Sequence, residues 1–353
     1  MKDLKQCRIE IDAIDQQLME LFEKRMALSK SVVEYKIENH LEIFQPERER
    51  EVIEKNLNRL NNDQLKEYAR CFIQEMMTVS KSYQSDLLPL ELDENIKTDF
   101  KKDPVVGYQG IAGAFSQSAV ENFFGEGTKN IGYRDFEDVY VALENGEIDY
   151  GVLPIENSLT GSINDNYDLI RKYGFYIVGE TAVNVSQCLM ALPGTKIEDI
   201  RQVYSHPQGL AQSSEFLYQH RYIEQRPFQD TAMAAKYVMD SKDPTKAAIA
   251  SPLACKLYGL EMLKENVQNK KNNRTRFMVI SKELICPKES DKVSVIFTLP
   301  HQVGALDNML QTIKQSQINM DRIESRPIET QYWQYYFYIC LLYTSPSPRD
   351  STS

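Results

Sequence analysis

The amino-acid sequence predicts a multidomain protein, in which an all-α module is followed by an α/β domain and a small α+β domain. No glycine occurs before Gly107. After Pro104, short apolar runs alternate with amphipathic stretches. From Lys292 onward the pattern reads strand, helix, strand, strand. With 353 residues, the chain is long enough for two or three domains.

The N-terminal module is predicted to consist of helices at 4–38, 47–60 and 63–85, because it is rich in Leu, Glu, Lys and Gln and lacks glycine. We assign residues 1–86 to it. Residues 87–103 lose the helical period and are predicted to form a linker.

The α/β domain is assigned to residues 104–284. Four strand-like runs are each followed by a helical stretch: "PVVGYQG" by "FSQSAVENFF", "YGVLPIE" by "INDNYDLIRKY", "VYSHP" by "QGLAQSSEFLYQH", and "AAIAS" by "PLACKLYGL". This alternation predicts a largely parallel sheet. The α+β domain is assigned to residues 291–339. Residues 340–353, dominated toward the end by Ser, Thr and Pro, are expected to be a non-native tail.

Composition excludes several classes of protein. The net charge of −10, from 41 Lys and Arg against 51 Asp and Glu, argues against nucleic-acid binding. Six scattered cysteines and four dispersed histidines predict neither disulfides nor a metal site. The sequence has no apolar leader or membrane-spanning run, so we expect a cytoplasmic protein. "GYQGIAG" lacks the GxGxxG spacing and no P-loop occurs, so no cofactor is expected.

The first predicted helix places cations on its apolar seam. Arg25 and Lys36 are eleven residues apart, which puts them about 16 Å apart in rise and about 20° apart in azimuth. They can therefore converge on one small anion. Arg8 lies about 25 Å from Arg25 and can serve the same ligand only across a dimer. The alternative is that each cation snorkels to the edge of the bundle.

Further polar residues accompany this seam. Arg48 and Glu49 begin the second helix, and Ser80 and Gln84 share a face of the third. Taken alone, the "ERERE" run is equally consistent with a solvated charged face. Together with the seam, these residues resemble the all-helical chorismate mutase family, in which intertwined homodimers bind chorismate inside the bundle.

This resemblance implies roles for individual residues. Arg8 would reach the partner's site, while Arg25, Lys36 and Arg48 would bind the carboxylates and ether oxygen of chorismate. Glu49, Ser80 and Gln84 would be polar contacts. Gln45 departs from the acidic residue of some members. A unimolecular Claisen rearrangement needs a dicarboxylate held in a compact conformer and cations near the oxygen that gains charge.

Several strand-to-helix junctions of the α/β domain carry small or hydroxyl residues, at 110–116, 154–163, 205–208, 230–231 and 251–252. Such junctions gather at the carboxyl ends of strands, where ligands bind. The alternative is helix capping, which we favour for "DT" and "SP".

The combination of "GYQGxxGAFS", "PIENS", "SHPQ" and "RTRF" resembles prephenate dehydratase, whose two α/β lobes close over prephenate as periplasmic binding proteins close over a solute. The resemblance implies that Thr275 is the catalytic hydroxyl, donating a proton to the leaving hydroxide, and that Arg276 contacts a substrate carboxylate. The remaining cleft-lining candidates are Ser116, Glu156, Asn157, Ser158, Ser205, His206, Gln208 and Thr231. A structural role for His206 competes with one as proton source. Gly209 replaces a common alanine, which we expect to matter little.

Strand alternation constrains this assignment. It points Thr275 to one side of its strand and Arg276 to the other, so both can meet one substrate only where the strand begins.

In the third domain, "HQVGALDNML" and "RIESRP" resemble the ACT regulatory domain, a ferredoxin-like α+β fold. The resemblance implies a phenylalanine site between subunits, formed by Gly304, Ala305, Leu306, Glu324, Ser325, Arg326 and Pro327. The alternative is a helix-start glycine and an edge strand that closes at proline. Only four of the six elements of an ACT domain are predicted. We therefore expect an exposed sheet edge and impaired control by phenylalanine.

Together these resemblances predict a bifunctional enzyme of phenylalanine biosynthesis that converts chorismate to prephenate and prephenate to phenylpyruvate. Two alternatives stay open. The helical module could be a non-catalytic dimerisation element beside a dehydratase, or the two-lobed domain could bind a solute without catalysis.

Overall fold

The computed structural model describes residues 3–39, 46–87, 96–270, 272–316, 318–328 and 333–343. The chain divides into two compact units, which we describe separately. One comprises residues 1–94, 299–320 and 341–353, and the other residues 95–298 and 321–340.

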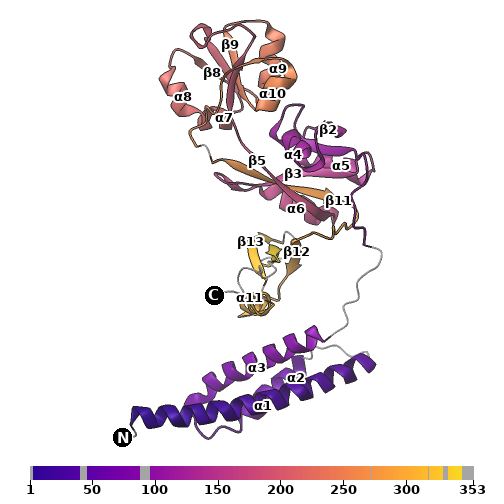
Figure 1. The fold of residues 1–353 in the computed structure, drawn as a ribbon, viewed down its shortest axis with the longest axis vertical. Helices are drawn as coiled ribbons and strands as arrows, with labels where there is room; N and C mark the ends of the chain where they lie inside the picture. Colours follow the sequence, from indigo (N-terminus) through magenta and orange to yellow (C-terminus); the bar gives the residue numbers. More distant parts are fainter. Residues whose placement is uncertain are drawn as a thin grey trace, which may run out of the picture. The chain divides into compact units, whose positions relative to one another are not determined.

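The first unit contains the predicted helices (Figure 1). They are α1 (Leu4–Glu38), α2 (Pro46–Leu57), the 3-10 turn η1 (Asp63–Leu65) and α3 (Lys66–Asp86), and the unit also holds α11 (Ala305–Gln315). The three predicted helices are thus confirmed to within three residues at each end. Helix α3 packs against both α1 and α2, and its contact with α2 forms a small apolar core around Leu57 and Ile73.

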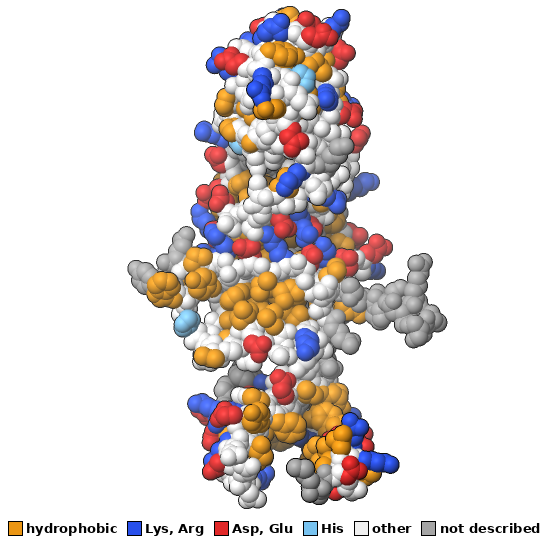
Figure 2. Space-filling model, turned by 90° about the vertical axis from the view of Figure 1, so that its left-hand side faces the viewer, with side chains coloured by type: hydrophobic (Ala, Val, Ile, Leu, Met, Phe, Trp, Pro, Cys, Tyr) orange, Lys and Arg blue, Asp and Glu red, His pale blue; other side chains and the backbone are white. Residues whose placement is uncertain are grey.

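Much of α1 is apolar and exposed. Ile14 is 55% exposed, Leu21 61% and Leu28 68%, whereas only Ser29 and Val33 of this helix are buried. Figure 2 shows hydrophobic side chains on the surface of the helical module, at the lower end of the view. A monomer rarely leaves so much apolar surface in water, so this surface is suited to a partner.

The second unit begins with an α/β lobe. Its sheet has the order β2-β1-β3-β11-β5, with β4 paired to β3. The strands are β1 (Val106–Gln109), β2 (Asn130–Tyr133), β3 (Tyr150–Asn157), β4 (Gly161–Ser162), β5 (Tyr176–Asn184) and β11 (Arg274–Ser281). Helix α4 (Phe115–Phe124) packs on one face, and α5 (Phe136–Glu144) and α6 (Asn164–Tyr173) pack on the other.

A second α/β lobe lies beyond β5 (Figure 1). Its sheet order is β10-β6-β9-β7-β8. These strands are β6 (Cys188–Ala191), β7 (Gln202–Ser205), β8 (Glu224–Pro227), β9 (Lys246–Ala250) and β10 (Glu261–Lys264), with the short turn η2 (Ile197–Asp199) before β7. Its helices are α7 (Pro207–Gln212), α8 (Ser214–Gln219), α9 (Thr231–Ser241) and α10 (Pro252–Tyr258).

The two-lobed prediction is confirmed, but the largely parallel sheet is not. In the first lobe, β11 runs antiparallel to β3 and β5, and in the second lobe β6 runs antiparallel to β9 and β10. The physical reason is the connectivity. The chain enters the second lobe through residues 185–187 and returns through residues 265–273, so the strands on either side of each crossing run against their neighbours.

The C-terminal sheet has the order β12-β14-β13 within the described residues. Its strands are β12 (Lys292–Thr298), β13 (Asn319–Pro327) and β14 (Tyr335–Leu342). This order of strand, helix, strand and strand matches the sequence prediction. The outer strand β12 exposes Val293 (52%) and Val295 (38%).

The structure describes part of the predicted linker and of the predicted tail. The described part of the linker is packed, because Phe100 contacts the rings of Phe123 and Tyr150 at centroid distances of 5.4 and 5.6 Å. The first residues of the predicted tail, Cys340 and Leu341, are buried and continue β14. Residues 344–353 and Gln45 lie outside the described residues. None of the described helices is long and apolar enough to cross a membrane.

Candidate active sites

The helical module holds a cavity of about 150 Å³. Its lining contains six of the seven residues predicted to bind chorismate, namely Arg25, Lys36, Arg48, Glu49, Ser80 and Gln84, together with Val32, Val52, Met77 and Lys81. Arg8 is exposed and does not line this cavity. Three of the predicted cations therefore converge in one cavity, whereas snorkelling apart would have scattered them.

The lining of this cavity carries more positive than negative charge. Lys81 Nζ lies 3.0 Å from Glu49 Oε1. Burial lowers the pKa of Lys36, while the charge of Glu49 opposes that shift. Burial also lowers the pKa of Arg25. With four cations and one carboxylate, the lining is matched to an anionic ligand.

A chain of hydrogen bonds orients the polar wall. Ser29 Oγ donates to Arg25 O (3.1 Å) and lies 2.7 Å from Ser80 Oγ, which accepts from Gln84 Nε2 (3.3 Å). Because Ser29 uses its proton on the backbone, Ser80 must donate to Ser29. Ser80 therefore orients Gln84, which lines the cavity. Ser29 was not among the predicted residues, and its position four residues after Arg25 is the signal that would have found it.

In the dehydratase-like domain, Thr275 meets Asn157. The two residues are direct neighbours in the antiparallel pairing of β11 and β3. Asn157 Nδ2 donates to Thr275 Oγ1 (2.9 Å) and to Asn273 Oδ1 (2.8 Å). The amide orientation is fixed, because Asn157 Oδ1 accepts from the backbone N–H groups of Leu159 (3.0 Å) and Thr160 (3.2 Å). Thr275 thus accepts from Asn157 and keeps its own proton to donate.

A second cavity of about 150 Å³ adjoins this cluster. It is lined by Leu159, Gln212, Gln268, Asn269, Lys270 and Asn273, which come from the first lobe, the second lobe and the return crossing. Asn273 is 1% exposed, and among the described residues its Nδ2 has no hydrogen-bond partner. A buried donor of this kind is costly unless a ligand or water accepts from it. Asn273 and Lys270 were not among the predicted site residues, because neither lies in a recognised motif.

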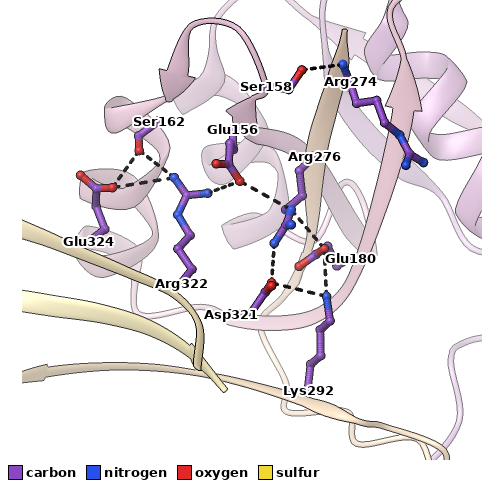
Figure 3. A network of polar contacts seen from close by, with 10 residues as sticks. All are labelled: Glu156, Ser158, Ser162, Glu180, Arg274, Arg276, Lys292, Asp321, Arg322 and Glu324. Atoms are coloured by element: carbon purple, nitrogen blue, oxygen red, sulfur yellow. Dashed lines mark hydrogen bonds and ion pairs between the residues drawn. The ribbon is translucent and has the colours of Figure 1, made fainter. Parts of the chain in front are cut away.

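Arg276 and Glu156 lie elsewhere. They face each other across β11 and β3, and Arg276 Nε is 3.6 Å from Glu156 Oε2. Their positions, one residue along each strand from Thr275 and Asn157, put them on the opposite face of the sheet. Figure 3 shows both side chains in a network with residues of the C-terminal sheet. The structure therefore does not bring Arg276 to Thr275.

Other predicted cleft residues have structural partners. Ser205 Oγ is fully buried and donates to Ile249 O (2.6 Å). His206 Nδ1 accepts from Gln208 N (3.2 Å) and caps α7, the kind of contact that the structural alternative for this histidine predicts. Ser158 Oγ accepts from Arg274 N (3.0 Å) and joins the end of β3 to the start of β11. Ser116 is buried at the start of α4, Gln208 is exposed, and Thr231 begins α9.

The capping interpretation holds at two junctions. Asp230 accepts from the N–H groups of Ala232 and Met233, and Ser251 accepts from Ala254 N. Gly209, by contrast, matters more than expected. A Cβ at this position would lie 2.5 Å from Ser205 Oγ, which is held by Ile249. Alanine would therefore displace a buried hydrogen bond.

The lobes touch at the loop after β1. Ser251 Oγ, on the second lobe, donates to Gly113 O (2.5 Å), and Tyr258 OH donates to Ala112 O (2.6 Å). Gly113 has φ of +92°, and an added Cβ would lie 2.9 Å from Ala254 Cα. Glycine therefore permits this close approach.

Replacing Gly113 by alanine should hold the lobes apart. We expect Gly113→Ala to lower kcat/KM for the dehydratase substrate by at least about tenfold, because lobe closure assembles the site. Gly125→Ala is the matched control, since Gly125 has φ of +99° and nothing within 4 Å of the added Cβ. If Gly113→Ala and Gly125→Ala lower kcat/KM equally, the cause is backbone strain and not separation of the lobes.

The predicted phenylalanine-site residues fall in both units. Gly304 precedes α11 with φ of +82°, and Ala305 and Leu306 begin that helix. On β13, Glu324 Oε2 accepts from Ser162 Oγ (2.7 Å) and Arg326 Nη2 donates to Asp168 Oδ2 (2.5 Å). Ser325 and Pro327 are exposed. The two charged residues of "ESRP" are therefore held by the first α/β lobe.

Comparisons with known proteins match this division of the chain. Residues 7–85 match the family model of chorismate mutase type II, and residues 106–285 match that of prephenate dehydratase. A bifunctional chorismate mutase/prephenate dehydratase of Aquifex aeolicus is 34% identical over 343 residues, which cover 97% of this chain and 90% of that protein.

Two further relatives bear on the α/β domain. An arogenate dehydratase/prephenate dehydratase of Arabidopsis thaliana is 37% identical over 278 residues, covering 74% of this chain and 72% of that protein. The solved structure of a prephenate dehydratase from Arthrobacter aurescens in complex with L-Phe has 27% identity and a TM-score of 0.61, covering 67% of this chain and 80% of that chain.

Proposed function

Because the chain belongs to the family of bifunctional chorismate mutase/prephenate dehydratases and carries both enzymatic domains, we propose that each of its two cavities is the site of one reaction. The helical module rearranges chorismate to prephenate, and the two-lobed domain converts prephenate to phenylpyruvate. The observation that carries the proposal is the convergence of Arg25, Lys36 and Gln84 with three other predicted residues in one cavity.

The mutase cavity supplies what a Claisen rearrangement needs. Arg25 and Arg48 bind the carboxylates and hold the compact conformer, which removes much of the entropic cost of reaching the transition state. Lys36 and Gln84 donate to the ether oxygen, which gains negative charge as its bond to carbon breaks. Glu49 holds Lys81 and moderates the positive charge of the site.

In the dehydratase site, Thr275 relays a proton to the departing hydroxyl, which leaves as water, and Thr275 regains its proton from solvent. Carbon dioxide leaves from the carbon across the ring, and aromatisation drives both losses. Asn157 Nδ2–H occupies an acceptor position on Thr275 Oγ1, so the Thr275 hydroxyl proton points away from Asn157. Lys270 and Asn273, which line the cavity, hold a substrate carboxylate, the role that was predicted for Arg276.

A direct test supplies the full chain with chorismate and follows chorismate loss and phenylpyruvate formation. Phenylpyruvate from both chorismate and prephenate supports the proposal. Turnover of prephenate alone would reduce the helical module to a dimerisation element. Prephenate binding without product would favour a solute-binding protein. Arogenate, offered separately, would give phenylalanine if it is accepted.

We expect mutase activity to fall at a lower alkaline pH than it would if the activity depended on a lysine of ordinary pKa. Lys36 has its pKa lowered by burial, so its cation is present only below that lowered value. The kcat/KM for chorismate, which reports the free enzyme, should therefore fall before the ordinary lysine pKa of about 10.4 is reached. In Lys36→Arg the alkaline fall should disappear. An unchanged profile would exclude Lys36 as the titrating group.

The apolar surface of α1 and the distant Arg8 support a homodimer in which Arg8 enters the partner's cavity. The relative solved with L-Phe supports phenylalanine as an effector acting at Gly304–Leu306 and Glu324–Pro327. All six cysteines are free thiols, which supports a cytoplasmic location.

A further inference from the structure

The strands that carry Thr275 and Asn157 present charges on their other face. Register pairs Arg276 with Glu156, and Glu180 lies two residues from the partner of Arg276 on β5. All three charged side chains therefore share one face of the sheet, opposite Thr275 and Asn157.

The C-terminal sheet completes this charged cluster (Figure 3). Asp321 Oδ2 accepts from Arg276 Nη1 at 2.6 Å. Arg322 Nη1 donates to Glu156 Oε2 (2.9 Å), and its Nη2 donates to Ser162 Oγ (2.7 Å). Lys292 Nζ lies 3.3 Å from Glu180 Oε1 and 3.7 Å from Asp321 Oδ2.

These ion pairs are better shielded than most on a protein surface. The Arg322 side chain is 10% exposed, and its guanidinium also lies 5.2 Å from the ring centroid of Tyr167. Burial alone would lower the pKa of Arg276, but the hydrogen bond that it donates to Asp321 and the charges of Glu180, Asp321 and Glu156 raise it. The same hydrogen bond lowers the pKa of Asp321. Both groups are therefore charged at neutral pH and attract each other across a 2.6 Å hydrogen bond.

We propose that Asp321 and Arg322 are positioning residues for dehydration, and that Arg276 acts together with them and not on the substrate. This inference rests on the proposed dehydratase function of the Thr275 site. Through Arg276 and Glu156, the C-terminal strand fixes the two backbone segments from which Thr275 and Asn157 project.

The local backbone makes such support necessary. The pairing of β11 with β3 shifts register between Arg276 and Phe277, immediately after Thr275. At a bulge the ladder hydrogen bonds are interrupted and the strand twists more strongly. The ion pairs of Arg276 and Glu156 are therefore more important for holding this segment in place than they would be in a regular strand.

The test compares Asp321→Asn and Arg322→Gln in the full chain, with prephenate as substrate and no phenylalanine. We expect kcat to fall about tenfold with KM changed less than about twofold, since transition-state geometry is lost before binding. Arg322→Lys should recover part of the loss. Mutase activity, measured on the same samples, should be unchanged and reports that the chain is folded.

Arg171→Gln is the matched control. The Arg171 guanidinium lies 4.9 Å from the ring centroid of Tyr336 on β14, so it belongs to the same interface but is not one of the charged residues of Figure 3. Its kcat should stay within about twofold of the parent. An equal loss in Arg171→Gln would make the effect one of general docking and overturn the positioning role. Unchanged kcat in both Asp321→Asn and Arg322→Gln would overturn it as well.

A double-mutant cycle separates Arg276 from a substrate contact. If Arg276 acts through Asp321, the double variant Arg276→Gln with Asp321→Asn should lose no more kcat than the worse single variant. If the losses in kcat of the two single variants multiply in the double variant, and Arg276→Gln alone raises KM, Arg276 contacts the substrate and the proposal is contradicted. Absence of phenylpyruvate from the unmodified chain would instead refute the dehydratase function itself.

Discussion

Thr275→Val should lower kcat for prephenate dehydration by about 10²- to 10⁴-fold, the range that one general acid supplies. Valine has nearly the shape of threonine but has no proton for the leaving hydroxide. Chorismate rearrangement should be unaffected, because the mutase cavity has no lining residue from this domain. Both activities can be measured on one sample, with prephenate and chorismate as separate substrates.

The substitution also has a structural cost. Thr275 is 8% exposed, and valine leaves one N–H of Asn157 without its acceptor, which costs about 1–3 kcal/mol. Thr275→Ser keeps the hydroxyl and is the matched control. It should retain most of the activity. Equal loss in the serine and valine variants, or parallel loss of the mutase, would mean that Thr275 is structural.

The geometry around Thr275 separates what local sequence predicts from what it cannot. Alternation along one strand was sufficient to place Thr275 and Arg276 on opposite faces, and the structure follows it. The residue across from Thr275 was not predictable, because Asn157 is 118 residues away and only the register of β3 and β11 brings it there. Family resemblance named Asn157 as a cleft residue but gave no reason for its position.

The same distinction holds elsewhere. Helix α1 was predicted at its observed limits, because a long run without glycine or proline depends on local propensity alone. The antiparallel strands β11 and β6 were not foreseen in the largely parallel sheet, because alternation of strands and helices does not reveal where a chain crosses between lobes. Ser205 was predicted to line the cleft, yet Ile249, 44 residues away, holds it inside the lobe.

Arg25→Ala should remove most of the mutase activity, by about 10²- to 10³-fold in kcat, because a preorganised charge is lost from the site. Dehydration of prephenate should be unaffected. The Arg25 Nη1 bond to Met76 O is long (3.4 Å) and its side chain is only half-buried, so the fold should tolerate the change. Chorismate consumption by the full chain is the measurement, and Lys24→Ala, an exposed neighbour on α1, is the control.

Arg8→Ala should cause a similar loss, although Arg8 lies outside the cavity of its own chain. If Arg8 enters the partner's cavity, each site is built from Arg25 of one chain and Arg8 of the other. Arg8→Ala and Arg25→Ala then each remove the contribution of a different chain. Unfolding and refolding the two variants together should then restore about a quarter of the activity, since half of the dimers are mixed and each has one complete site. Each variant refolded alone stays inactive. Failure of the mixture to recover activity, with a dimer verified by light scattering, would exclude a shared site and leave Arg8 a surface residue.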